Sequence, residues 1–267
     1  MATYGRSDHH KRPVRSQSKH REQEPAPWAN VVEFAREALG FNPDARQLEV
    51  LQSKANRGIL NCTRQWGKSM IAAIMALYTA LATPGALVLV ASPGERQSAE
   101  FLHKVEELAK RLGIKPRGDG KNSCSLLLPN ASRIIGLPGT EGTVRGFSKV
   151  SLLLIDEAAR VSEALYKALR PTLAVSGGAL WMMSTPNGKS GFFYETWERG
   201  GPEWHRVTVP ATQCARIPKA FLEEELRATG SSSYRQEYMC EFEDNGRQMF
   251  SSDLVRNALR DVPPLAM

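Results

Sequence analysis

A short apolar strand followed by the loop Asn61 to Ser69 constrains the fold of this chain more than any other feature of its sequence. The loop ends in Gly67-Lys68-Ser69, and in such a loop backbone N–H groups and the following helix N-terminus bind phosphates, while the lysine reaches the outer phosphates and the serine binds Mg²⁺. The usual spacing has a glycine where this chain has Cys62, and Arg64 lies inside the loop. The sequence therefore predicts a nucleoside triphosphate site with an irregular phosphate loop.

Composition limits the class of protein. Of the 267 residues, 42% are hydrophobic, which is enough for one substantial core, and no run of about eighteen apolar residues predicts a membrane span. There is no apolar N-terminal stretch typical of a secretory signal, and the four cysteines are too dispersed for a metal site or a disulfide framework. We expect a soluble protein of a reducing cytosol.

Positive charge is concentrated at the N-terminus. Residues 1–21 hold six Lys or Arg and one acid, so +5 of the net charge of +7 lies there and +2 remains for the rest. Few apolar residues and two prolines at its edge predict that residues 1–27 form a disordered basic tail. The tail either touches nucleic acid or an acidic partner, or is a solvated leader without a role of its own.

Apolar runs alternate with amphipathic segments along the rest of the chain. The expected helices are 31–39, one from 43, 68–81, 95–112, 162–169, 191–197, 218–228 and 232–240, and the expected strands are 58–61, 86–91, 125–128, 132–136, 150–155, 179–184 and 204–209. This order predicts an α/β fold, a mostly parallel sheet flanked by helices, of the P-loop NTPase (ASCE or RecA-like) type. We expect a core over 28–210, a helical lid or linker subdomain over 211–248, and a junction segment over 249–267.

A second motif follows the apolar run Leu152 to Ile155. Asp156 at the end of this predicted strand is placed to hold Mg²⁺ together with Ser69, and Glu157 to orient or deprotonate an attacking water. The alternative is that the two acids only cap the following helix. Ligands collect at the carboxyl ends of parallel strands, where both motifs are expected.

Two arginines are candidates for stabilising the charge of a departing phosphate. Arg64 lies in the phosphate loop and would act within the same chain, or else it pairs with a carboxylate to brace the loop. Arg145 lies in a glycine-rich loop before the acidic strand and would reach a neighbouring subunit, or else it contacts DNA.

Two further segments have both a functional and a structural interpretation. The Gln47 amide matches the donor and acceptor edge of adenine, and Arg46 is able to stack or bind phosphate, although an Arg-Gln pair on a helix is also common on a solvent-facing surface. Ser184, Thr185 and Pro186 follow a strand and are placed to sense the γ-phosphate, although the same residues also form good turns.

Together, the segments Thr63 to Ser69, Leu154 to Ala158 and Ser184 to Gly188 resemble the ATPase domain of the large terminase subunit of tailed bacteriophages, over roughly residues 43–250. That family has a phosphate loop of the form Arg-Gln-x-Gly-Lys-[Ser/Thr], so the resemblance makes Cys62 expected and Arg64 diagnostic. It implies nucleotide contacts from Gln47, Arg46, Arg64, Gln65, Trp66, Gly67, Lys68 and Ser69. It also implies Ser69 and Asp156 as metal ligands, Glu157 as the catalytic carboxylate, Arg145 or Arg64 as the arginine finger, and Ser184, Thr185 and Pro186 as the coupling segment.

The resemblance also implies partners and cofactors. These are ATP and Mg²⁺, double-stranded DNA, the portal protein of a procapsid, the small terminase subunit, and further copies of the chain in a ring of five. A protein of this kind works in the host cytoplasm, transiently on the procapsid, and is absent from the mature virion.

Large terminases usually continue into a nuclease domain, and the chain stops at Met267, so we expect no nuclease activity here. Two other functions are weighed beside the packaging motor. One is a helicase-like ATPase, against which the short remainder after residue 208 argues. The other is a non-catalytic nucleotide-binding or DNA-docking module, against which the intact Lys68, Ser69, Asp156 and Glu157 argue.

Overall fold

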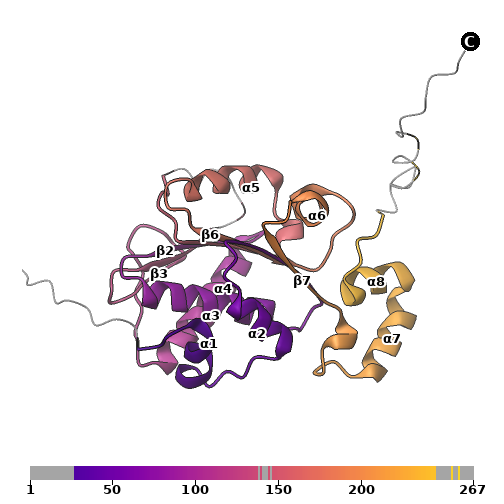
Figure 1. The fold of residues 1–267 in the computed structure, drawn as a ribbon, viewed down its shortest axis with the longest axis horizontal. Coiled ribbons are helices and arrows are strands. Elements are labelled where there is room, and N and C mark those ends of the chain that lie inside the picture. The colour runs from indigo at the N-terminus through magenta and orange to yellow at the C-terminus, as the bar shows by residue number, and fades with distance from the viewer. Residues whose placement is uncertain are drawn as a thin grey trace, which may run out of the picture.

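A mostly parallel sheet forms the centre of the molecule (Figure 1). The structure, a computed structural model, describes residues 27–137, 139, 144, 146–244, 254 and 258. Within them seven strands lie in the order β3-β4-β2-β5-β6-β1-β7, and every neighbouring pair is parallel except the edge pair β3 and β4. The strands are β1 Arg57–Cys62, β2 Leu87–Ala91, β3 Ser125–Leu127, β4 Arg133–Leu137, β5 Leu152–Asp156, β6 Ala179–Ser184 and β7 Trp204–Val209. The predicted fold class, a mostly parallel α/β sheet, is confirmed.

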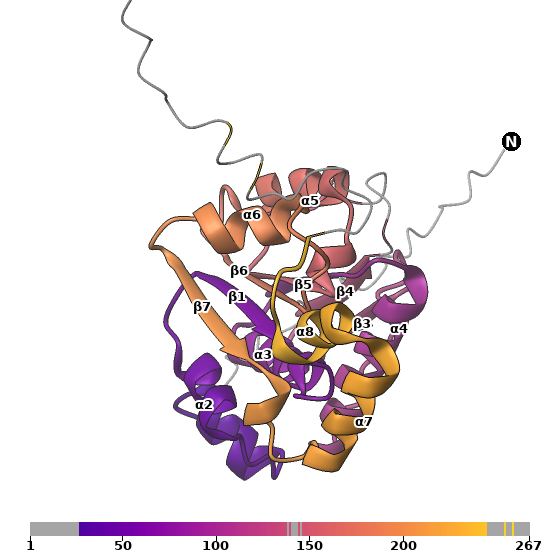
Figure 2. The same ribbon diagram turned by 90° about the vertical axis from the view of Figure 1, so that its right-hand side faces the viewer.

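Helices cover both faces of this sheet. In Figure 1, α1 to α4 lie on one side, α5 and α6 lie on the other, and α7 and α8 lie beyond β7. Figure 2 turns this last side toward the viewer, so that α7 and α8 stand in front of the strands. The helices are α1 Val31–Glu33, α2 Ala45–Gln52, α3 Lys68–Ala82, α4 Glu95–Arg111, α5 Glu163–Leu169, α6 Gly191–Arg199, α7 Lys219–Thr229 and α8 Ser231–Met239.

The central strands are buried on both faces, which explains their continuous apolar runs. In β5, Leu152 and Leu154 belong to the core under α3 and α4, whereas Leu153 and Ile155 belong to the core under α5 and α6. Successive side chains of a strand point to opposite faces, so a strand with two buried faces needs an apolar residue at every position. No helix in the described part of the chain is long and apolar enough to cross a bilayer.

The expected helix over 31–39 differs from the observed one. After α1, the segment Phe34–Ala38 forms a π-helical turn, in which the Leu39 N–H donates to the carbonyl oxygen of Phe34. The wide turn is accompanied by complete burial of Phe34 and Ala35. Apart from Pro27, the predicted basic tail lies outside the described residues.

Strand β1 carries the phosphate loop, and its position in the sheet depends on Gly58. Gly58 is the register partner of Trp181 on β6, and a Cβ atom built at Gly58 would overlap the Trp181 indole ring. Trp181 is buried, so its ring has little room to move away. The absence of a side chain at Gly58 therefore leaves the space that the Trp181 indole ring occupies against β1.

We expect Gly58→Ala to lower the free energy of unfolding by about 1–3 kcal/mol, because an added methyl group overpacks this site. Denaturant unfolding of the purified protein measures the change. Gly118→Ala is the matched control, since no atom lies within 4 Å of a Cβ there and its effect should stay within about 0.5 kcal/mol. Equal losses in the two variants would contradict this account of β1.

Candidate nucleotide-binding site

A cleft of about 400 Å³ opens where β1, β5 and β6 end. Four cations and two carboxylates line it, which gives the lining a net positive charge suited to a polyanion. The lining residues are Arg64, Gln65, Gly67, Lys68, Ser69, Met70, Lys104, Asp156, Glu157, Arg160, Ser184 and Thr185. The two predicted motifs therefore meet in one cleft at the carboxyl edge of the sheet.

The phosphate loop turns from β1 into α3 through two residues with left-handed backbone conformations. Gln65 has a φ of 64° and Gly67 a φ of 102°. Trp66 between them is buried in the core, which anchors the middle of the loop. The side chains of Gln47 and Arg216 both donate hydrogen bonds to the Trp66 carbonyl oxygen. The buried Trp66 side chain and the two hydrogen bonds to its carbonyl thus fix the loop on its core side, while other loop residues line the cleft.

Lys68 is the first residue of α3, and its side chain bonds back to the start of the phosphate loop. Its Nζ donates to the carbonyl oxygens of Cys62 and Thr63, each at 2.7 Å. Burial lowers the pKa of Lys68, because an ammonium group loses hydration inside the protein. The side chain lies along the cleft with its charge at the base of the loop.

Ser69 and Asp156 join the two motifs directly. The Ser69 hydroxyl donates to Asp156 Oδ2 at 2.9 Å, and the Glu157 N–H donates to Asp156 Oδ1 at 3.0 Å. Burial raises the pKa of Asp156, while the hydrogen bond from Ser69 opposes this shift. One hydroxyl and one carboxylate fit Mg²⁺, which takes oxygen ligands and usually completes its shell with water and phosphate oxygens.

Glu157 follows β5 in a left-handed backbone conformation, with a φ of 50°. Such a conformation is uncommon for residues other than glycine and often marks a functional position. The Glu157 side chain makes no capping hydrogen bond to the turn Ala158–Arg160. Glu157 occupies the N-cap position of that turn, but its side chain lines the cleft and does not cap it.

Arg64 is paired with a carboxylate that the sequence analysis did not single out. Its Nε lies 2.8 Å from Oε2 of Glu237 on α8, and Arg160 Nη2 lies 2.9 Å from Oε1 of the same carboxylate. Arg160 Nη1 also donates to Thr185 Oγ1 at 3.1 Å. The bracing role weighed for Arg64 is therefore present in the structure, and its role as an arginine finger stays a prediction.

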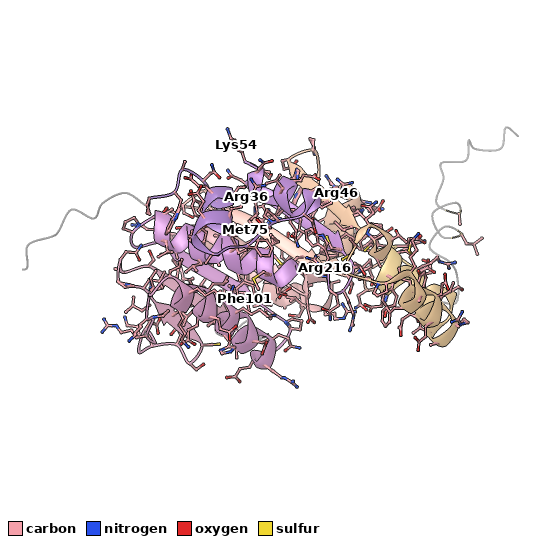
Figure 3. The ribbon with its side chains drawn as sticks, turned by 90° about the horizontal axis from the view of Figure 1, so that it is seen from below. Arg36, Arg46, Lys54, Met75, Phe101 and Arg216 are labelled. Carbon is pink, nitrogen blue, oxygen red and sulfur yellow. The ribbon has the colours of Figure 1, made fainter. Side chains whose placement is uncertain are left out.

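Gln47 is buried and engaged at both ends of its amide. It is 1% exposed, accepts from the Asp44 N–H through Oε1 and donates to the Trp66 carbonyl through Nε2. The alternative of a solvent-facing glutamine is therefore wrong. Arg46 does face solvent and pairs with Glu49; Figure 3 labels it together with Arg216. Neither Gln47 nor Arg46 lines the cleft, and their adenine contacts stay a prediction.

The predicted coupling segment, Ser184 to Pro186, begins where β6 ends. Ser184 and Thr185 line the cleft, and the Ser184 hydroxyl is buried without a hydrogen-bond partner among the described residues. Pro186 is buried beside them but outside the lining. Arg145 lies outside the described residues, so its placement relative to the cleft stays a prediction.

Three residues near the cleft were missed by sequence reasoning. Arg160 and Lys104 line it, and Glu237 holds two of its arginines. Arg160 follows Glu157 by three residues, and this proximity was a usable signal. Lys104 lies in the middle of α4 and Glu237 in α8, far from either motif, so only the tertiary fold brings them here.

We expect Gln47→Ala to lower the free energy of unfolding by about 1–3 kcal/mol without any nucleotide, because it removes two hydrogen bonds of a buried side chain and leaves a cavity in its place. Thermal or denaturant unfolding measures this loss. Gln52→Ala at the exposed end of the same helix is the matched control. If both variants are as stable as the unmodified chain, Gln47 does not hold the loop in place.

Comparisons with known proteins agree with this geometry. The model of the family described as Terminase large subunit, T4likevirus-type, N-terminal, matches residues 59–256. The terminase large subunits of Thermus phage G20c and Thermus virus P23-45 are each 25% identical over 250 residues, a match that covers 80% of this chain and 52% of each relative. The chain therefore spans about half the length of the curated relatives it matches.

Solved structures show the same fold. The large terminase ATPase domain of Thermus phage P74-26 is 25% identical, with a TM-score of 0.67, and the match covers 78% of this chain and 96% of that one. The HK97 bacteriophage large terminase is 14% identical, with a TM-score of 0.67 and coverage of 80% and 55%. The predicted P-loop NTPase fold is confirmed.

Proposed function

Because this chain belongs to the terminase large subunit family, T4likevirus-type, N-terminal, we propose that it hydrolyses ATP to drive double-stranded viral DNA into a procapsid. The observation that carries the proposal is the hydrogen bond of 2.9 Å between Ser69 and Asp156, which brings the phosphate loop and the acidic strand end into one cleft. Lys68 and Glu157 line the same cleft. Hydrolysis of a nucleoside triphosphate requires phosphate-binding, metal-binding and water-orienting groups in one site.

Each residue has one task in the proposed hydrolysis. The loop backbone and Lys68 bind the phosphates, and Ser69 and Asp156 hold Mg²⁺, which neutralises phosphate charge when bound. Glu157 orients a water molecule and accepts its proton as the water oxygen bonds to the γ-phosphorus. The bond from the γ-phosphorus to the bridging oxygen breaks, and ADP and phosphate leave. Arg64, or Arg145 of a neighbouring copy, stabilises the charge that develops on the transferred group.

The family membership favours this function over the two alternatives. The family model that matches residues 59–256 is that of a terminase large subunit and not of a helicase. A module without turnover does not need a catalytic carboxylate, yet Glu157 lines the cleft in a backbone conformation uncommon for glutamate. The proposed partners are double-stranded DNA, a portal protein, a small terminase subunit and further copies of this chain in a ring of five.

Replacing Glu157 by glutamine should leave ATP binding intact and reduce turnover by about 10²–10⁴-fold, because glutamine keeps the shape of the side chain but cannot accept a proton. Phosphate release measures turnover, and equilibrium dialysis with labelled ATP measures binding. Glu163→Gln, on the exposed start of α5, is the control and should keep full activity. Unchanged turnover in Glu157→Gln would refute its role.

A mixing experiment tests whether Arg145 acts on a neighbouring copy. Arg145→Ala retains its own phosphate loop, and Lys68→Ala retains its own Arg145, so each variant alone should hydrolyse ATP slowly. If the arginine is supplied by a neighbour, mixtures at varied ratios should exceed the sum of the separate rates, because some sites then combine an intact loop with an intact arginine. Rates that only add would place Arg145 outside the neighbouring site.

A further inference from the structure

Of the four cations that line the cleft, Lys104 on α4 is the one that forms no hydrogen bond or ion pair with any residue that the structure describes. Arg64 and Arg160 both pair with Glu237. Lys68 donates to two carbonyl oxygens of the phosphate loop. Lys104 is half-buried, and a charged group that has lost part of its hydration is stabilised by a counter-charge. The free protein does not supply that counter-charge to Lys104.

Helix α4 itself carries an acid that Lys104 does not use. Glu100 lies one turn earlier, at the spacing of four residues at which helical ion pairs form. Both side chains are described, and they form no ion pair with each other. Farther along the same helix, the same spacing does give a pair, in which Lys110 Nζ lies 2.9 Å from Glu106 Oε1. Lys104 therefore faces the cleft and not a neighbour on its own helix.

The cleft meets a second cavity, of about 410 Å³, at Lys104. Ser69, Asp156 and Glu157 line both cavities together with Lys104, so the two cavities meet at the proposed metal ligands and the proposed water-orienting carboxylate. Helix α4 supplies the rest of the second lining, which consists of Arg96, Gln97, Glu100 and Phe101. Helices α3 and α4 pack on each other on one side of the sheet (Figure 1). Lys104 thus borders the site from the side of α4, next to the acidic pair.

Lys104 also lies close enough to Asp156 to affect its ionisation. Burial raises the pKa of Asp156, and the positive charges of Lys68 and Lys104 are among the influences that oppose this rise. A lysine that only kept Asp156 ionised would support the binding of Mg²⁺. Its loss would then weaken the binding of a diphosphate and of a triphosphate with Mg²⁺ alike.

We propose that Lys104 is a ligand of the outermost phosphate of a bound triphosphate, which it contacts from α4 while Lys68 contacts the phosphates from the loop. This inference rests on the proposed ATP site. Because Lys104 shares both cavities with Glu157, it lies on the side of the site where the water attacks and where charge develops on the γ-phosphate oxygens. An ammonium group that donates to these oxygens stabilises that charge. The phosphate in turn supplies the counter-charge that Lys104 lacks.

The test compares the dissociation constants of a non-hydrolysable ATP analogue and of ADP, each with saturating Mg²⁺, by calorimetry. Lys104→Met removes the charge and keeps the apolar stem of the side chain. It should raise the dissociation constant of the triphosphate analogue about tenfold, because one charge-assisted hydrogen bond is lost. The dissociation constant of ADP should change less than about twofold, because ADP lacks the phosphate that Lys104 contacts. Phosphate release at saturating ATP should also fall, since the contact persists while the γ-phosphate is transferred.

Arg96→Gln is the matched control. Arg96 lies two turns before Lys104 on the same face of α4 and lines the second cavity without lining the cleft. Its replacement removes the same charge from the same face, so both dissociation constants should stay within about twofold of the unmodified chain. An effect as large as that of Lys104→Met would show that only the general field of α4 matters, and the inference would be wrong.

Two other outcomes would also overturn the inference. Equal weakening of both nucleotides in Lys104→Met would limit Lys104 to its effect on Asp156, and unchanged affinity for the triphosphate analogue would exclude the contact. If Lys104→Met does not fold, Lys104→Ala takes its place, since alanine is the best helix former, and the same outcomes apply. If the unmodified chain binds neither nucleotide, the proposed ATP site itself fails.

Discussion

The hydrogen bond between Ser69 and Asp156 is the contact on which the site depends, because it joins loops from strands that are not neighbours. Strand β6 lies between β1 and β5 in the sheet, so the bond bridges the end of β6. Ser184 ends that middle strand with a buried hydroxyl that has no partner among the described side chains and main chain. The predicted coupling segment is thus placed between the phosphate loop and the acidic pair by the order of the strands alone.

The same sheet explains why the loop does without its usual first glycine. Cys62 is the last residue of β1 and keeps an extended strand conformation that any residue adopts, so no left-handed backbone is needed there. Its buried thiol stays neutral, since burial raises its pKa. The turn is made later, by Gln65 and Gly67, and a Cβ atom at Gly67 would lie 3.1 Å from Gln47 Nε2. The glycine that the loop requires is therefore Gly67.

The fold was predictable from the sequence because the patterns that indicate its strands and helices are local in the chain. The run Leu152 to Ile155 and the loop Asn61 to Ser69 each predict a strand end, and parallel strands bring such ends to one edge. The capping pattern of Asp44 with Gln47 is also local, but it was not predicted, and only the structure identifies Gln47 as a helix-capping residue. By contrast, Glu237 reaches Arg64 across 173 positions of the chain, and no local pattern encodes that approach.

The two helices that hold residues of the site differ in how they are fixed. Helix α3, which carries Lys68 and Ser69, buries seven side chains, whereas α8 fully buries none. Each large apolar side chain buried contributes about 1.5–3 kcal/mol, while a partly exposed ion pair contributes about 0–1 kcal/mol. Helix α3 is therefore fixed by its buried apolar side chains, whereas α8 is held near the cleft by hydrogen bonds and ion pairs.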